Sequence, residues 1–354
     1  MNEMPPAEEP FSLEELQKAV RNHGMPLEAL RYDITPAGLH YLLIHYDIPA
    51  TDGAAWRLDI AGNAERQLSL SLDEIKARPS RTLAVTMECA GNGRARMANR
   101  VRSQPWLVEA VGTAEWTGTP LAGVLAEAGV RPESVEIVFT GVDHGIQGEV
   151  EQDYQRSLTL DEAMGADVLL AWAMNGQPLL PQHGAPLRLI VPGWYGMTSV
   201  KWLNRIEAVT SPFRGYQQAT AYRIQMSDDD PGEPLTRMKV RALMAPPGIA
   251  EFPSTNRLVD ASAITLFGRA WSGFAPIARV EIGVDGDWHQ ADLGAGLGPH
   301  AWRRWTWTWQ AVPGEHVLSC RATDAAGNSQ PLEPFWNLQG MGNNYVQTVP
   351  VRVR

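Results

Sequence analysis

Apolar and polar positions follow three successive patterns along the chain, and the first is a short helical one. Ser12 is a suitable N-cap, and Glu15 completes a capping box with it. Three apolar side chains share one face of the predicted helix: Leu13, Leu16 and Val20. We interpret residues 1–30 as an N-terminal extension that packs on the surface of the protein.

A mixed pattern of short alternating runs and short helical runs occupies residues 31–227. The helical runs predict helices at 121–128 and 160–164. The alternating runs predict strands at 41–45, 56–60, 83–87, 135–140 and 187–191. Since strands and helices do not alternate regularly, we expect a mixed α+β domain rather than a βαβ repeat.

The third pattern predicts a β-sandwich. Residues 228–234, Asp-Asp-Asp-Pro-Gly-Glu-Pro, are charged and rich in turn residues, and we interpret them as a linker. Residues 235–354 contain short alternating runs separated by turn signals, at 262–268, 277–284, 302–309 and 316–322. This spacing is typical of an immunoglobulin-like β-sandwich.

Tryptophans are concentrated in one predicted strand of the sandwich. Trp305, Trp307 and Trp309 occupy every second position, and Trp302 precedes them. Alternation places the three on one face of the strand, where an aromatic stripe packs in a core or at an interface. Both interpretations stay open from the sequence.

Length and charge narrow the class of protein. A chain of 354 residues exceeds the usual size of one domain, which agrees with two domains that each bury a core. The net charge of −10 argues against a nucleic-acid surface, which needs clustered lysines and arginines. No apolar run approaches the ~20 residues that span a bilayer, and the polar start has no signal-peptide pattern. We expect no membrane association and a cytoplasmic location, unless an export signal has been removed.

Cys89 is the strongest candidate for chemistry. It lies between an apolar strand and a polar turn in which Gly91 and Gly93 permit close backbone approach and Arg94 favours the thiolate. The second cysteine, Cys320, falls on an alternating strand and is expected in the core, so no disulfide framework is indicated. A lone cysteine is often a small buried apolar residue. The glycine turn favours a ligand or a nucleophile.

Motifs of other mechanisms are not found. The sequence contains no GxSxG elbow, no HExxH pair, no P-loop and no GxGxxG run after a strand. The glycine-rich run at 294–298 lies between predicted sandwich strands and is best interpreted as a turn.

Several motifs in one order resemble the sulfite oxidase family. The run Cys-Ala-Gly-Asn-x-Arg at 89–94 resembles the molybdenum-ligating segment of that family, and residues 174–188 are similar to its pterin-binding segment. Further matching runs lie at 191–196, 200–203 and 336–340. The resemblance covers roughly residues 30 to 354.

This resemblance implies a molybdenum–molybdopterin cofactor and oxygen-atom transfer, here the oxidation of sulfite to sulfate. Cys89 is then the protein ligand of molybdenum, since a soft thiolate suits a metal with further sulfur ligands. The positions that match the pterin-binding pattern are His183, Arg188 and Lys201, and those that match the substrate pocket are Arg94, Arg102, Trp106 and Tyr222. Taken singly, His183 could be a turn histidine, and Arg188 or Lys201 could be a solvated charge on a strand. Tyr222 could be a loop tyrosine.

The resemblance also implies partners. No His-Pro-Gly-Gly run of the cytochrome b5 type is present, so we expect no haem domain and a separate electron acceptor. In the family the C-terminal sandwich mediates a homodimer, and the tryptophan stripe would then partly serve a two-fold interface.

Two histidines compete for one cofactor-binding position upstream of Cys89. Arg21-Asn22-His23 copies the family tripeptide, whereas His45 copies its surroundings and lies 44 residues before Cys89. Because His23 would require an insertion within compact strands, we assign the role to His45.

The resulting alignment removes two arginines from the expected substrate pocket. Leu43 and Thr348 stand where the family usually has them. We therefore expect weak binding of a doubly charged anion. A reductase of nitrate or of an S- or N-oxide is the alternative enzyme. A cofactor-free immunoglobulin-like binding protein, with the tryptophan stripe presented to a partner, is the alternative from another class; molybdenum content distinguishes it from the enzymes.

Overall fold

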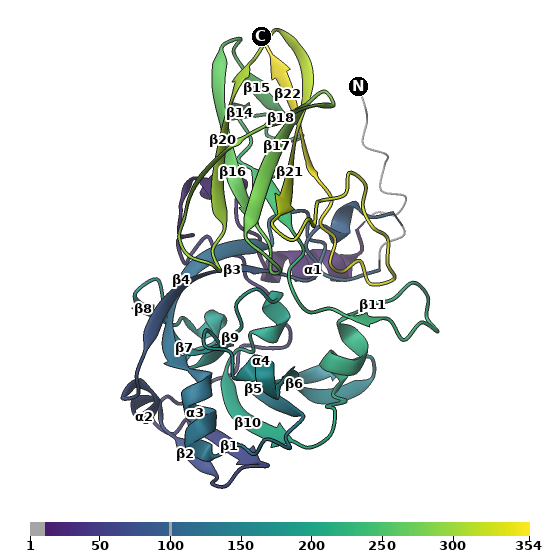
Figure 1. The fold of residues 1–354 in the computed structure, drawn as a ribbon. Helices are drawn as coiled ribbons and strands as arrows, with labels where there is room; N and C mark the ends of the chain where they lie inside the picture. Colours follow the sequence, from purple (N-terminus) through teal and green to yellow (C-terminus); the bar gives the residue numbers. More distant parts are fainter. Residues whose placement is uncertain (1–10, 99–100) are drawn as a thin grey trace.

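Two parts of the chain stack along the long direction of the molecule (Figure 1). The structure is a computed structural model, and it describes residues 11–98 and 101–354. A mixed α+β part holds the purple to green segments of Figure 1, and a β-sandwich above it holds the green to yellow segments and the C-terminus. The predicted mixed α+β fold followed by an immunoglobulin-like sandwich is confirmed.

Two sheets enclose the core of the mixed part. The first has the order β2-β1-β10-β5-β6, and the second has the order β3-β4-β7-β8 with β9 paired to β7. The strands of the first sheet are β1 (Leu58–Gly62), β2 (Leu68–Leu70), β5 (Glu136–Gln147), β6 (Val150–Thr159) and β10 (Leu203–Val209). The strands of the second are β3 (Arg81–Glu88), β4 (Val111–Pro120), β7 (Leu169–Met174), β8 (Gln177–Pro178) and β9 (Arg188–Ile190).

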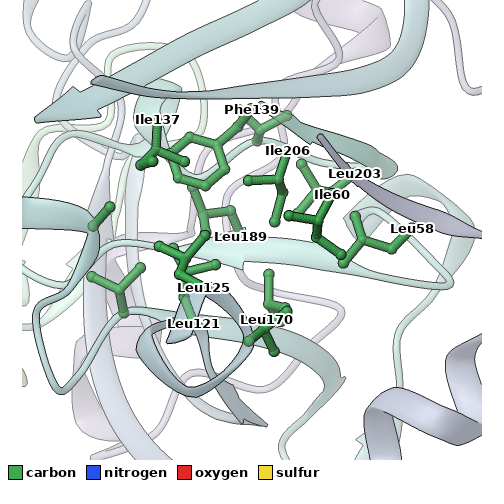
Figure 2. Packing of buried hydrophobic residues seen from close by; sticks show 14 of the residues in the cluster. Leu58, Ile60, Leu121, Leu125, Ile137, Phe139, Leu170, Leu189, Leu203 and Ile206 are labelled. Atoms are coloured by element: carbon green, nitrogen blue, oxygen red, sulfur yellow. The ribbon is translucent and has the colours of Figure 1, made fainter. Parts of the chain in front are cut away.

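Three short helices connect these strands: α2 (Leu72–Lys76), α3 (Leu121–Ala128) and α4 (Leu160–Ala163). The predicted helices at 121–128 and 160–164 are thus found as α3 and α4. Figure 2 shows side chains of α3 packed against both sheets, from which Ile60, Phe139, Leu170, Leu189 and Ile206 enter the same core. Burial of this apolar surface is the main stabilising contribution to the mixed part.

The predicted strand at 41–45 is wrong. Only Leu42 makes an isolated antiparallel bridge, to His23. The backbone groups that follow are bound by side chains instead, since the Leu43 carbonyl accepts from Lys201 Nζ at 2.7 Å and the Ile44 N–H donates to Asn22 Oδ1 at 2.7 Å. The other four predicted strands of this region correspond to β1, β3, β5 and β9.

The sandwich packs a four-stranded sheet against a six-stranded one, in the orders β13-β16-β20-β19 and β14-β15-β22-β21-β17-β18. The first holds β13 (Arg241–Met244), β16 (Ala263–Trp271), β19 (Asp292–Gly296) and β20 (Arg303–Gln310). The second holds β14 (Ile249–Ala250), β15 (Arg257–Val259), β17 (Ile277–Val284), β18 (Asp287–Gln290), β21 (Gly314–Asp324) and β22 (Gln347–Val353).

The tryptophan stripe belongs mainly to the core of this sandwich. Trp305 and Trp309 are buried in the same cluster as Cys320, which was expected in the core. Trp307 is partly buried and stacks on His289 with ring centroids 4.9 Å apart. An interface role is therefore not needed to explain the alternation of these residues.

The N-terminal helix α1 (Leu13–Arg21) has the predicted capping box between Ser12 and Glu15. Its apolar face does not pack on the protein, because Leu13 is 68% and Val20 90% exposed. The helix is held at its C-terminal end by polar contacts, such as the Arg21–Asp47 ion pair at 2.8 Å. None of the helices in the described part of the chain is long and apolar enough to cross a membrane.

The segment interpreted as a linker is an ordered hairpin loop. It connects β11 (Arg223–Ile224) to β12 (Glu233–Pro234), which pair as a two-stranded sheet. The Asp230 carboxylate accepts hydrogen bonds from the backbone N–H groups of Met226 and Gly232, both at 2.8 Å. The charged turn thus satisfies its own backbone groups.

A buried ion pair joins the two parts of the molecule. Glu88 ends β3, and its carboxylate lies 2.6 Å from Arg241 Nη1 on β13. The same carboxylate accepts from Trp271 Nε1 on β16 and from Asn92 Nδ2, both at 2.9 Å. Because both charged side chains are almost fully buried, each depends on the other to compensate its lost hydration.

We expect Arg241→Met to lower the free energy of unfolding by about 3–5 kcal/mol, because the substitution leaves the Glu88 carboxylate buried without its counter-ion. Denaturant unfolding followed by tryptophan fluorescence measures this loss. Arg205→Met is the matched control, since it removes an exposed ion pair with Glu207 and should cost less than about 1 kcal/mol. Equal losses in the two variants would contradict the prediction.

Candidate active site

A cavity lies where the C-terminal end of β3 meets several loops of the mixed part. Cys89 follows β3 directly, the 3₁₀ turn η3 (Pro181–His183) precedes β9, and the 3₁₀ turn η4 (Gly196–Thr198) follows it. The side chains and backbone that line the cavity come from His40, Tyr41, Leu42, Leu43, His45, Met87, Cys89, Ala90, Asp143, Tyr154, Gln182, His183, Arg188, Gly196, Met197, Ser199, Val200, Lys201 and Tyr222.

The Cys89 turn is held by backbone and side-chain bonds on both sides. The Cys89 N–H donates to the Ala110 carbonyl at 2.9 Å, and Asn92 Oδ1 accepts from the Ala110 N–H at 3.1 Å. A Cβ atom at Gly91 would lie 2.8 Å from an Arg94 guanidinium nitrogen, so only glycine lets that cation approach the turn.

Burial raises the pKa of the Cys89 thiol. The Gly91 backbone N–H, the charge of Arg94 and the Trp106 indole act in the opposite direction. A cation or a metal ion in the cavity would complete the change to thiolate, because both favour the charged sulfur. The position therefore suits a metal ligand better than an inert core residue.

Two cations of the cavity are bound by neutral groups. Arg188 donates to the carbonyls of His183 at 3.0 Å and Ser199 at 3.1 Å, and Lys201 Nζ donates to the carbonyls of Leu43 at 2.7 Å and Gln182 at 3.3 Å. Burial lowers the pKa of Arg188 to about 10 and that of Lys201 to about 7. A bound anion would raise both pKa values again, since a nearby negative charge favours the protonated forms.

Three histidines line the cavity. His183 and His40 meet edge to face with ring centroids 6.2 Å apart, and burial lowers the pKa of His183 to about 3 and that of His40 to about 4. His45 bonds Gln147 through Nε2 at 2.7 Å and packs on Tyr154. Neutral imidazoles of this kind donate or accept hydrogen bonds without adding charge.

Polar atoms of the cavity lack partners in the described part of the chain. They are Arg188 Nε, His40 Nε2 and Asp143 Oδ1, all buried. Buried polar atoms of folded proteins are normally hydrogen-bonded, so the three atoms indicate that a polar ligand completes the site. The unpaired Arg188 donor, the two cations bound only by neutral groups and the thiol together fit an anionic pterin that carries a soft metal.

The structure brings six of the nine predicted site residues to this cavity: Cys89, His45, His183, Arg188, Lys201 and Tyr222. Arg94 and Trp106 are buried behind the Cys89 turn, where Arg94 Nε donates to the Gln339 carbonyl at 2.8 Å. The rejected candidate His23 is exposed and lies outside the cavity lining.

Two predicted pocket positions are not in the cavity. Arg102 is exposed, and its charge acts on Glu14 of the N-terminal helix. Thr348 is exposed on β22 opposite Ser319, whereas its neighbours Gln347 and Val349 turn inward. Because strand side chains alternate, Thr348 cannot reach the cavity from this register. Leu43, by contrast, lines it.

The polar groups of the cavity that sequence reasoning missed include His40, Asp143 and Tyr154. Asp143 had a signal, since it interrupts an apolar strand, and its burial raises the pKa of the carboxyl to about 7. Tyr154 lies in β6, for which no strand was predicted. His40 had no such signal, because it belongs to none of the motifs described above.

Family models match both parts of the chain. Residues 45–217 match the oxidoreductase molybdopterin binding domain, and residues 235–354 match the Mo-co oxidoreductase dimerisation domain. The chain is a member of the sulfite oxidase family of molybdopterin-dependent oxidoreductases.

Relatives in this family have different names. Mitochondrial sulfite oxidase of Rattus norvegicus is 34% identical over 343 residues, which cover 90% of this chain and 62% of that enzyme. Nitrate reductase [NADH] 1 of Oryza sativa subsp. japonica is 31% identical over 351 residues and is covered to 38%. The sulfane dehydrogenase SoxCD from Paracoccus pantotrophus matches in structure with a TM-score of 0.81 and 27% identity, over 94% of this chain and 86% of that chain. The chain thus spans less than two thirds of the rat and rice enzymes.

We expect His45→Ala to weaken cofactor retention by about tenfold, because one buried hydrogen-bonding side chain of the cavity is lost. His23→Ala is the control and should retain the cofactor as the wild type does. Molybdenum content and pterin fluorescence after equal dialysis measure retention. A loss in His23→Ala with none in His45→Ala would show that the two histidines were assigned in the wrong order.

Proposed function

We propose that the protein is a molybdenum-cofactor oxidoreductase that oxidises sulfite to sulfate and passes the electrons to a separate acceptor. The observation that carries this proposal is a buried thiol facing a cavity whose cations are bound only by neutral groups. That combination suits a soft metal on an anionic organic ligand.

Cys89 would hold the molybdenum, and His45, His183, Arg188 and Lys201 would hold the pterin. Asp143 and His40 add two acceptors at its edge, since the neutral His40 ring donates through Nδ1 to the Tyr41 carbonyl at 3.0 Å and its unpaired Nε2 carries no proton. When bound, the cofactor supplies oxygen-atom transfer and takes up two electrons. The protein contributes fixed positive charge and fixed hydrogen-bond donors, which need no reorganisation when the anion binds.

The cavity combines phenol groups with apolar walls. Tyr222 presents a hydroxyl, while Leu43, Met87 and Met197 exclude water. Arg94 would add positive charge from behind the Cys89 turn. An anion in such a site gains strong hydrogen bonds because water competes less.

The dimerisation family match suggests a homodimer formed through the sandwich. The acceptor is proposed to be a separate redox protein or a small oxidant. Nitrate reduction is the second candidate, supported by the nitrate reductase relatives and by Leu43, whose neutral side chain suits a singly charged anion.

One experiment tests the proposal as a whole. Protein purified from cells that make the molybdenum cofactor should contain molybdenum and should reduce ferricyanide when sulfite is added. Molybdenum-loaded protein that reduces nitrate but ignores sulfite would favour the second candidate. Protein without molybdenum would favour a binding protein instead.

We expect Cys89→Ser to fold normally and to lose more than about 100-fold in turnover at matched molybdenum content, because a hydroxyl is a harder donor than a thiolate. Thermal unfolding checks the fold, and turnover per molybdenum checks the chemistry. Cys320→Ser, in the sandwich core, is the control for loss of a thiol. Near-normal turnover in Cys89→Ser would remove this residue from the mechanism.

Leu43→Arg should lower the KM for sulfite by about tenfold, because the added cation lies in the cavity wall and binds the anion directly. Thr348→Arg should leave the KM within about twofold of the wild type, because its position is exposed on β22. Steady-state kinetics with ferricyanide provide both values. Equal gains in the two variants would contradict the placement of these residues.

A further inference from the structure

A buried arginine that none of the sequence motifs includes lies beside Tyr222. Arg156 on β6 is 2% exposed, and its guanidinium carbon lies 5.5 Å from the centroid of the Tyr222 ring. In the described part of the chain it forms no ion pair, and its Nε has no hydrogen-bond partner. A buried charge without a counter-ion is costly, so this cation requires an explanation.

Arg156 holds the turn that carries Tyr222. Its Nη1 donates to the carbonyl of Gln217, the first residue of the π-helix η5 (Gln217–Ala221), and Tyr222 follows that helix directly. The next residue of β6, Ser157, donates its N–H to Gln218 Oε1 at 3.4 Å. π-helical turns are rare and often occur at functional sites. Here the residue that follows the turn is Tyr222, which lines the cavity.

The same face of β6 supplies a second phenol. Tyr154 lies two residues before Arg156, so both side chains leave the strand on one side. Tyr154 lines the cavity, and its hydroxyl donates to the Met197 carbonyl at 2.9 Å. β6 therefore places the Tyr154 phenol in the cavity wall and the Arg156 guanidinium against the Tyr222 ring.

The cation also changes the donor strength of Tyr222. Burial raises the pKa of this phenol to about 12, and the Tyr154 hydroxyl and then the charges of Arg156 and Arg94 act against that rise. A phenol beside a positive charge donates a stronger hydrogen bond to an anion. The effect does not require Arg156 to touch the anion.

We propose that Arg156 is a positioning residue that aims the Tyr222 hydroxyl into the cavity. Its charge would also replace part of the positive charge that is missing at Leu43, where the family usually has an arginine. The anion that Tyr222 meets is identified through the proposed function, on which this part of the inference rests. The positioning itself depends only on the contacts between β6, η5 and Tyr222.

A double-mutant cycle on the molybdenum-loaded protein tests the inference, with sulfate as the probe anion in calorimetry. Arg156→Met should weaken sulfate binding by about tenfold, because the Tyr222 donor loses its orientation and its neighbouring charge. Once Tyr222→Phe has removed the hydroxyl, Arg156→Met should cost less than about twofold more. Arg156→Lys should restore most of the affinity, since an ammonium group keeps the charge and can donate to the Gln217 carbonyl.

Hydrogen–deuterium exchange gives a readout that needs no substrate. Arg156→Met should speed exchange of the amides at 217–222, whereas Arg257→Met should not. Arg257 is the matched control because its guanidinium also donates to backbone carbonyls, those of Pro247 and Gly248, but in the sandwich.

The outcomes separate the inference from the proposed function. Unchanged exchange in Arg156→Met, or an equal loss of sulfate affinity with and without the Tyr222 hydroxyl, would overturn the inference. If the wild type neither binds sulfate nor oxidises sulfite, while exchange rises only in Arg156→Met, sulfite oxidation fails as the function and the positioning of Tyr222 stands.

Discussion

The architecture of the active site depends on the buried ion pair and hydrogen bonds of the Glu88 carboxylate. Glu88 is the last residue of β3, and Cys89 follows it, so a bond that fixes the carboxylate also fixes where the thiol leaves the strand. Its partners Arg241 and Trp271 belong to the sandwich, while Asn92 belongs to the thiol turn. The sandwich is therefore part of the scaffold of the cavity and not only a dimerisation module.

The positive charges of the cavity have no negatively charged hydrogen-bond partner among the described residues. Arg188 and Lys201 donate to backbone carbonyl oxygens, which stabilise a cation less than a carboxylate does. Such a site stores unfavourable desolvation energy that an anionic ligand relieves on binding. Ligand binding to the folded state then adds directly to stability, so cofactor loading and resistance to unfolding are linked.

Local patterns predicted what depends on neighbours in sequence. The helices α3 and α4, the alternating strands of the sandwich and the glycine turn after Cys89 all follow from periodicity or turn chemistry. The stretch at 41–45 alternates like a strand, yet Asn22 and Lys201 bind its backbone from distant parts of the chain. The positions of Arg102 and Thr348 were predicted wrongly for another reason. Motif spacing does not specify the direction in which a side chain points.

The contacts that complete the thiol turn have a consequence for the order of synthesis. Glu88 and Arg241 lie 153 positions apart, and the Gln339 carbonyl that accepts from Arg94 lies 245 positions after it. A ribosome must therefore release nearly the whole chain before the turn around Cys89 acquires its native support. Loading of the metal proposed for Cys89 would consequently follow translation, and the turn of the nascent mixed part stays without these contacts until Gln339 has been synthesised.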